Sequence, residues 1–185
     1  MSLTYGIISV TALVLLGACI IIDRKREKWL RLLFVSVFLA NFGYFLLSAS
    51  KTLDEALLSN RILYSGNVFF PFFMFMIILQ LCGVNYSRWI PAILSVVGFA
   101  MLLLVASPGY LTVYYEAVSF EIVDGIAVLI KEYGPLHILY YIYLFSYFAA
   151  MLAVIVYSIN RKKVSTHIHG IILLFAVFID ILVWL

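Results

Sequence analysis

Long apolar runs separated by shorter polar segments form the dominant pattern along the chain. A helix that spans a bilayer needs about 20 mostly apolar residues, and six runs reach or approach that length. We predict membrane spans over 3–22, 30–50, 62–84, 90–106, 136–159 and 170–185, with one long connection over 107–135. The expected fold is an all-α integral membrane helix bundle with six transmembrane helices, forming a single domain over residues 1–185.

The long connection over 107–135 carries a strand pattern instead of a helical one. Val118, Phe120 and Ile122 alternate with polar residues, and a second apolar run follows over 126–130. Between the two runs stand Asp124 and Gly125, a pair favoured in two-residue type I′ turns. We therefore predict a small extracellular β-hairpin between helices four and five. An irregular loop is the alternative.

Basic residues indicate how the chain is oriented in the membrane. They gather after the first, third and fifth runs, over 24–31, at Arg88 and over 161–163. These segments hold nine of the twelve Lys and Arg residues, and Lys51, Arg61 and Lys131 remain for the other side. Cytoplasmic loops carry the excess of basic residues in membrane proteins. We expect a multi-pass cell-membrane protein with an extracellular N-terminus and cytoplasmic basic loops.

Composition supports the membrane assignment and narrows the chemistry. The chain is 66% hydrophobic and 11% charged, whereas soluble domains are about 25% charged. The lipid bilayer is therefore an expected partner, and the net charge of +3 does not indicate nucleic acid. Cys19 and Cys82 both lie inside apolar runs and match no disulfide or zinc pattern. His167 and His169 fit an interfacial loop better than a metal pair, so we expect no metal and no cofactor.

Polar residues recur at intervals of three and four in three predicted helices, which places them on single helix faces. Polar groups at membrane depth are costly and tend to mark sites, so we expect an outward-facing polar pocket. Simple helix packing is the alternative for each residue, and an aromatic belt accounts for Tyr110, Tyr114, Tyr115 and Tyr133. The candidate ligand-binding residues are Asn41, Tyr44, Tyr64, Asn67, Tyr140, Tyr143, Tyr147 and Asp180.

Asp180 is the only acidic residue inside a predicted span. It lies near the middle of the sixth run, where an ionised carboxylate would be costly. Asn41 and the tyrosines of the fifth helix are its expected hydrogen-bond partners. Asp180 is either a site residue or a tie between helices.

Two short motifs resemble those of a known family. Tyr64 and Gly66 are followed by Pro71 in the third run, and Gly134-Pro135 leads into a fifth run that bears Tyr143. Together with the basic first loop and the hairpin-like segment, this order resembles the N-terminal seven-helix region of bacterial membrane histidine kinases. The resemblance implies a sensor module that relays a signal to a cytoplasmic output. The family has a seventh helix and an output domain, and neither is found in these 185 residues.

The predicted function is that of a sensor or receptor in two-component signal transduction, not of an enzyme. The chain holds no zinc-protease motif, nucleophile elbow or phosphate-binding glycine loop. It would bind an unknown small ligand, extracellular or membrane-derived, and act on a cytoplasmic signalling domain, with a homodimer as a further option. Two alternatives stay open: a small transporter or permease subunit built around Asp180, and a structural subunit of a membrane assembly.

Overall fold

The computed structural model describes residues 2–22, 28–123 and 125–161. Within these ranges the chain forms five helices and one hairpin. They are α1 (Ser2–Ile22), α2 (Lys28–Ala49), α3 (Leu53–Leu81), α4 (Trp89–Val105), β1 (Tyr115–Val123), β2 (Ile126–Tyr133) and α5 (Ile138–Asn160). The predicted sixth span over 170–185, with Asp180, and the pair His167 and His169 lie outside the described residues.

The structure supports three candidate membrane-spanning helices, whereas the sequence predicts six. Among the described residues, α2, α3 and α5 are long and apolar enough to cross a bilayer, while α4 and the apolar part of α1 are shorter. A mostly helical fold with three candidate membrane-spanning helices and a small two-stranded sheet is therefore confirmed for the described residues. Six spans stay a prediction.

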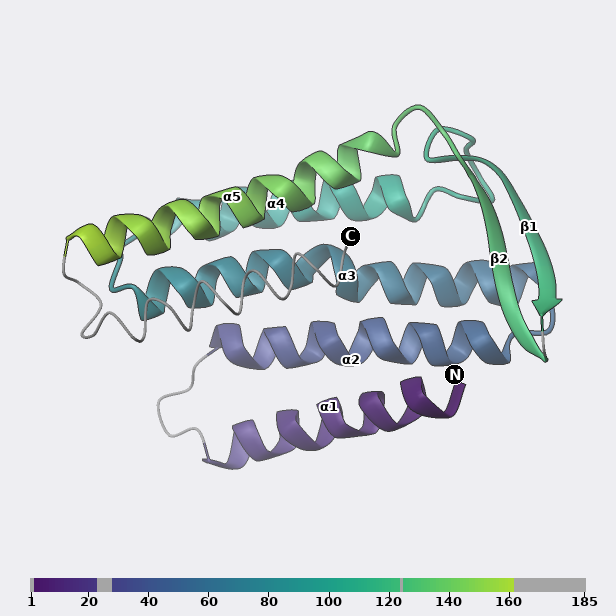
Figure 1. Ribbon diagram of the computed structural model, residues 1–185, viewed down its shortest axis with the longest axis horizontal. Coiled ribbons are helices and arrows are strands. Elements are labelled where there is room, and N and C mark those ends of the chain that lie inside the picture. The colour runs from purple at the N-terminus through teal and green to yellow at the C-terminus, as the bar shows by residue number, and fades with distance from the viewer. Residues whose placement is uncertain (1, 23–27, 124, 162–185) are drawn as a thin grey trace.

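The helices lie side by side along the long axis of the molecule (Figure 1). Helix α2 lies between α1 and α3, and α4 and α5 lie on the other side of α3. The hairpin crosses one end of the bundle, which we call the hairpin end. Lys28, Arg88 and Arg161 lie at the opposite end, which we call the basic end.

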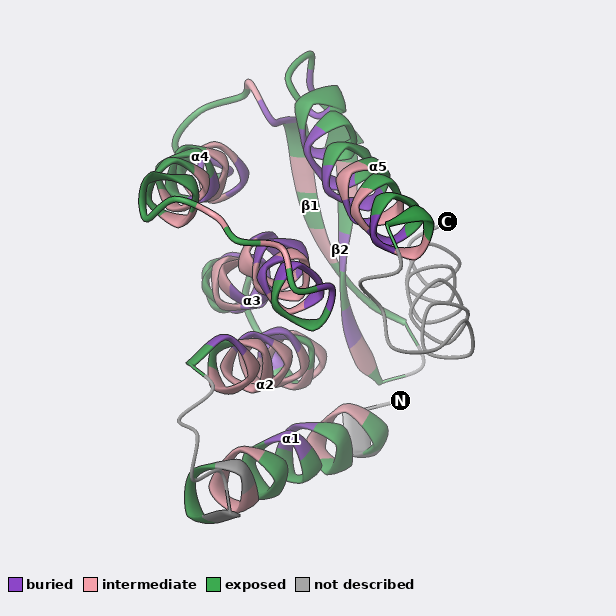
Figure 2. Cartoon of the chain, turned by 90° about the vertical axis from the view of Figure 1, so that its left-hand side faces the viewer, coloured by how far each residue is buried: buried purple, intermediate pink, exposed green. Residues whose placement is uncertain are grey.

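The buried core follows α3 along the bundle. Figure 2 shows buried residues mainly on the faces that the surrounding helices turn towards α3. The outward faces expose large apolar side chains such as Val96 and Leu103, which are 69% and 75% exposed. An apolar outer surface of this kind fits contact with lipid.

Glycines bring α2 and α3 into close contact. A Cβ atom added to Gly66 would lie 2.5 Å from the backbone nitrogen of Ala40, and one added to Gly43 would lie 2.5 Å from the Cα atom of Leu63. Small residues let helix backbones approach in this way, and such contacts are a main source of helix association in membranes. The pair α2–α3 is therefore the most closely packed part of the bundle.

Helix α3 begins at Leu53, well before the span predicted from Ile62. Its start is fixed by a reciprocal capping arrangement. The Glu55 backbone N–H donates to Thr52 Oγ1 at 3.3 Å, and the Lys51 backbone N–H donates to the Glu55 carboxylate at 2.7 Å. With 29 residues the helix is about 43 Å long, which exceeds a hydrocarbon core of about 30 Å. Its first turns therefore extend past the apolar run that the sequence analysis counted.

The capping arrangement gives a first prediction. Thr52→Ala should lower the free energy of unfolding by about 1 kcal/mol, because a backbone N–H of the first turn loses its acceptor. Thr11→Ala is a matched control, since the Thr11 hydroxyl bonds only to the Ile7 carbonyl of its own helix. Unfolding titrations in detergent would measure both variants. Equal losses in the two would contradict the assigned cap.

The predicted hairpin is confirmed. Strands β1 and β2 pair antiparallel, and Val123 stands opposite Ile126, so the turn is two residues long. Gly125 has a φ angle of +75°, a conformation that glycine adopts without steric cost. Asp124 lies outside the described residues. Where the hairpin returns to the bundle, the Gly134 N–H donates to the Tyr114 carbonyl at 3.0 Å.

Candidate ligand site at the hairpin end

Polar and aromatic side chains from α3, β1, β2 and α5 and from the flanking loops gather at the hairpin end. Asn60 and Tyr64 come from successive turns of α3, Lys131 comes from β2, and Tyr140 comes from α5. All but Lys131 are at most 9% exposed. We call this group the hairpin-end cluster; its members are Asn60, Tyr64, Tyr114, Tyr115, Lys131, His137 and Tyr140.

Tyr64 lies at the centre of the cluster. Its hydroxyl is hydrogen-bonded to the Tyr115 hydroxyl at an oxygen–oxygen distance of 2.7 Å. The rings of Tyr114 and Tyr140 meet the Tyr64 ring edge-on, with centroid distances of 6.1 and 5.6 Å. Edge-on aromatic pairs are favourable beyond the area they bury. Tyr64 thus connects α3 to both the hairpin and α5.

Lys131 places a cation among these rings. Its ammonium donates to Asn60 Oδ1 at 2.9 Å and lies 5.6 and 5.2 Å from the ring centroids of Tyr64 and Tyr115. Lysine is rarely buried, because its charge loses hydration. Burial lowers the pKa of Lys131 to about 8. Ring faces and one amide oxygen therefore replace only part of the lost hydration.

The other titratable groups of the cluster outside the spans are held neutral. Burial lowers the pKa of His137, and the nearby Lys131 charge lowers it further. Burial also raises the pKa of Tyr114 and of Tyr115 above the ordinary phenol range. Since these groups stay uncharged at neutral pH, Lys131 supplies the positive charge of the cluster.

A crevice on the surface of the molecule lies beside the cluster. It has a volume of about 250 Å³ and lies between the start of α3 and the start of β1. Tyr115 belongs to both the crevice wall and the cluster. A small molecule bound there would therefore contact the side chain that is hydrogen-bonded to Tyr64. Residues of the wall include Leu57, Gly109, Tyr110, Thr112 and Glu116.

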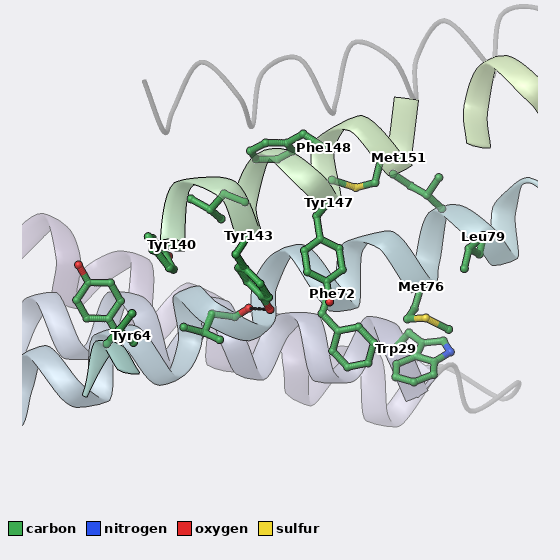
Figure 3. Close-up of a cluster of buried hydrophobic side chains, with 14 of the residues drawn as sticks. Trp29, Tyr64, Phe72, Met76, Leu79, Tyr140, Tyr143, Tyr147, Phe148 and Met151 are labelled. Atoms are coloured by element: carbon green, nitrogen blue, oxygen red, sulfur yellow. Dashed lines mark hydrogen bonds between the residues drawn. The ribbon is translucent and has the colours of Figure 1, made fainter. Parts of the chain in front are cut away.

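Three tyrosines of α5 extend from the cluster towards the middle of the bundle. Figure 3 shows Tyr140, Tyr143 and Tyr147 pointing from α5 towards α3. Successive ring centroids are 6.4 and 5.0 Å apart. The Tyr143 hydroxyl donates to the Val68 carbonyl at 2.8 Å, so this phenol is satisfied inside the bundle. We call these three residues the tyrosine stripe.

The structure brings together part of the predicted site. Tyr64 and Tyr140 lie in the hairpin-end cluster, and Tyr143 and Tyr147 continue it. Asn67 is buried on α3, one turn from Tyr64, with 7% exposure. Each predicted stripe on α3 and α5 thus faces the interior.

Two predicted residues on α2 make contacts outside the cluster, although Tyr44 also interacts electrostatically with Tyr64 and Tyr140. The Asn41 amide donates to the Val37 carbonyl of its own helix at 2.8 Å. Tyr44 is 38% exposed and stacks on Tyr5 of α1 with a centroid distance of 5.0 Å. A joint polar face of α2, α3 and α5 therefore stays a prediction. Asp180, the expected partner of Asn41, lies outside the described residues.

Several residues of the cluster are not among the site residues predicted from the sequence. The aromatic belt is the wrong explanation for Tyr114 and Tyr115, which are 0% and 3% exposed. The spacing of Asn60 from Tyr64 would have added it to the α3 stripe, had the early start of the helix been recognised. In β2, alternation puts Lys131 on the same face as the buried Ala127 and Leu129, so an inward lysine was detectable.

The comparison with protein families decides the assignment. A model of the N-terminal seven-transmembrane region of histidine kinases matches residues 6–185. The chain belongs to this family. No curated protein and no solved structure matches the chain. This histidine-kinase sensor region is therefore a membrane component of signal transduction, as its short motifs indicate.

Proposed function

We propose that this sensor region binds a small ligand at the hairpin end and relays the binding event to a cytoplasmic kinase output. The observation that carries the proposal is the hydrogen bond between Tyr64 and Tyr115, which joins the long helix α3 to the hairpin inside a buried cluster. A ligand that prefers one arrangement of this contact would shift the bundle between two packings. The kinase output would respond to that shift.

The ligand class follows from the crevice beside Tyr115. Its volume of about 250 Å³ lies just below the usual range of ligand sites, about 300–1,000 Å³. Its wall combines leucines with a threonine hydroxyl and the carboxylate of Glu116. A small, water-soluble molecule with both polar and apolar parts fits this surface best.

A continuous series of packed rings supports a relay along α3. From Tyr64 it passes through the tyrosine stripe to Phe75, whose ring centroid is 6.0 Å from that of Tyr147. Near the basic end, the Trp29 indole N–H donates to the Tyr86 hydroxyl at 3.0 Å. Packing of this kind can carry coupling, but only a measured effect on output shows that it does.

Removing single hydroxyls tests the proposal. Tyr64→Phe and Tyr115→Phe each delete one partner of the central hydrogen bond and keep the ring. In the complete membrane kinase, reconstituted in vesicles, we expect both variants to change the autophosphorylation rate severalfold and in the same direction. Tyr157→Phe is the matched control, because Tyr157 is 49% exposed and lies near the end of α5 that is remote from the cluster. Wild-type rates in both cluster variants would refute a role for the cluster in signalling.

The proposed orientation places the hairpin outside the cell and the basic end in the cytoplasm. It is supported by the basic residues Lys28, Arg88 and Arg161, which lie together at the end opposite the hairpin. In a chain without its native cysteines, Glu121→Cys should react with an impermeant maleimide on intact cells. Arg88→Cys should react only after permeabilisation. The reverse pattern would overturn the orientation.

A further inference from the structure

A membrane-facing groove lies between α4 and α5 and is separate from the crevice at the hairpin end. It has a volume of about 490 Å³, within the usual range for ligand sites. Figure 2 shows α4 and α5 on either side of α3, and both pack on α3. The groove runs over α3 between them. Its sides include Leu94, Val97 and Met101 of α4 and Leu139, Ile142 and Ala150 of α5.

Close contact between α4 and α3 at one point sets the shape of the groove. A Cβ atom added to Gly98 would lie 2.9 Å from Cε1 of Phe69, so the glycine lets α4 rest on that ring. The floor of the groove is aromatic and consists of Phe75, Tyr143 and Tyr147. These rings are held in the core, and they leave a furrow between the two outer helices.

The chemistry of the groove selects an apolar occupant. Among the described residues, no charged side chain lines it. Two of its three hydroxyl groups are already used within the bundle: the Ser146 hydroxyl donates to the Ile142 carbonyl at 2.6 Å, and the Tyr143 hydroxyl donates to the Val68 carbonyl. The third, the Tyr147 hydroxyl, is buried without a hydrogen-bond partner among the described residues. A polar ligand would find few partners there, whereas a hydrocarbon chain would bury its surface against leucine, valine and aromatic rings.

We propose that this groove binds the single hydrocarbon chain of an amphiphile dissolved in the bilayer, such as a free fatty acid. The groove lies between two apolar helices, and within the described part of the chain it is open sideways, where lipid would lie. Its lining extends along α5 from Leu139 to Ala150, a length of about 16 Å at 1.5 Å per residue, which accommodates one extended hydrocarbon chain lying along the helix. A diacyl lipid could insert one chain only by holding its second chain apart in the bilayer, whereas a single-chain amphiphile has no such constraint.

Occupancy of the groove would reach the hairpin-end cluster through shared residues. Tyr143 and Tyr147 form part of the floor, and the stripe to which they belong continues through Tyr140 to Tyr64. The groove would thus be a second, membrane-side input to the same sensor. This effect on the sensor rests on the proposed function, whereas binding of the hydrocarbon chain in the groove does not.

Photolabelling with a defined probe tests binding directly. The protein in phosphatidylcholine nanodiscs is exposed to palmitic acid that carries a diazirine in its chain, and labelled peptides are mapped by mass spectrometry. We expect saturable labelling of the α4 and α5 segments that line the groove. An excess of palmitic acid without the diazirine should abolish this labelling by competition. A phosphatidylcholine with the same photoreactive chain should give only weak labelling there, which no competitor saturates.

Neighbouring residues provide matched variants. Ala150→Phe and Val97→Phe place a ring inside the groove, and Ala149→Phe and Val96→Phe place the same ring on the adjacent exposed position outside the set of lining residues. We expect saturable labelling to fall about tenfold in the first pair, since overpacking disfavours the bound chain, and to stay unchanged in the second. Unfolding titrations would check that all four variants fold.

The outcomes separate this inference from the proposed function. Equal, non-saturable labelling by both probes would show bulk lipid only and would overturn the groove site, as would equal effects of the two pairs of variants. In that case an altered kinase rate in Tyr64→Phe would still support the sensor proposal. Saturable labelling together with unchanged rates in the cluster variants would leave the groove as a lipid site without the proposed sensor mechanism.

Discussion

Gly66→Leu should prevent α2 from packing on α3 and so abolish the folded bundle. A Cβ atom at this position would collide with the Ser36 carbonyl oxygen and lie 2.5 Å from the Ala40 nitrogen. Both are backbone atoms of a helix, which cannot move aside as the end of a flexible side chain can. We expect the free energy of unfolding to fall by at least about 3 kcal/mol, a large part of the total stability of a domain.

Size-exclusion chromatography after detergent extraction, followed by unfolding titration, would measure this loss. Gly17→Leu is the matched control, since a Cβ atom on Gly17 would meet nothing within 4 Å. It should change the stability by no more than about 0.5 kcal/mol. A monodisperse, fully stable Gly66→Leu protein would contradict the close contact between α2 and α3.

Stability should rise with pH above neutrality because of Lys131. Burial lowers its pKa to about 8 in the folded protein, whereas an exposed lysine has a pKa of about 10.4. Between these values the unfolded chain binds more protons than the folded one, so the free energy of unfolding increases with pH. The increase should be on the order of 1 kcal/mol between pH 7 and pH 9. Above pH 9 the tyrosines oppose it, because burial raises the pKa of Tyr114 and Tyr115 in the folded protein and these phenols ionise first in the unfolded chain.

Lys131→Met removes the titrating group and should flatten this dependence. Lys51→Met, at an exposed position, should leave it unchanged. Unfolding titrations at several pH values, with the three proteins compared at each, would separate Lys131 from other groups. The same slope in wild type and in Lys131→Met would show that Lys131 keeps an ordinary pKa and is not buried as described.

Local patterns in the sequence predict much of this fold. The first five apolar runs correspond to α1–α5, because apolar length alone separates membrane helices from other segments. The hairpin follows from the alternation around Phe120 and from the turn signal before Gly125. The early start of α3 is missed because Thr52 and Glu55 form a capping signal in a polar segment that a search for apolar runs ignores.

The candidate site is only partly predictable because it depends on contacts between distant segments. The stripe of Tyr140, Tyr143 and Tyr147 follows from helical periodicity within one element. By contrast, Lys131 meets Asn60 across 71 positions of the chain, and no local pattern reports which strand residue lies over which helix. Likewise, the helical period that includes Tyr44 does not reveal that its ring also stacks on Tyr5 of α1.

The central claim is that an event at the hairpin end changes kinase output on the other side of the membrane. It is tested most directly by stepping the external pH from about 7 to about 9 across sealed vesicles that hold the complete kinase, with the internal pH fixed. Lys131 should lose much of its positive charge in this step, since burial lowers its pKa to about 8. We predict that the autophosphorylation rate changes in wild type and not in Lys131→Met. No response in wild type, or the same response in both proteins, would contradict the account.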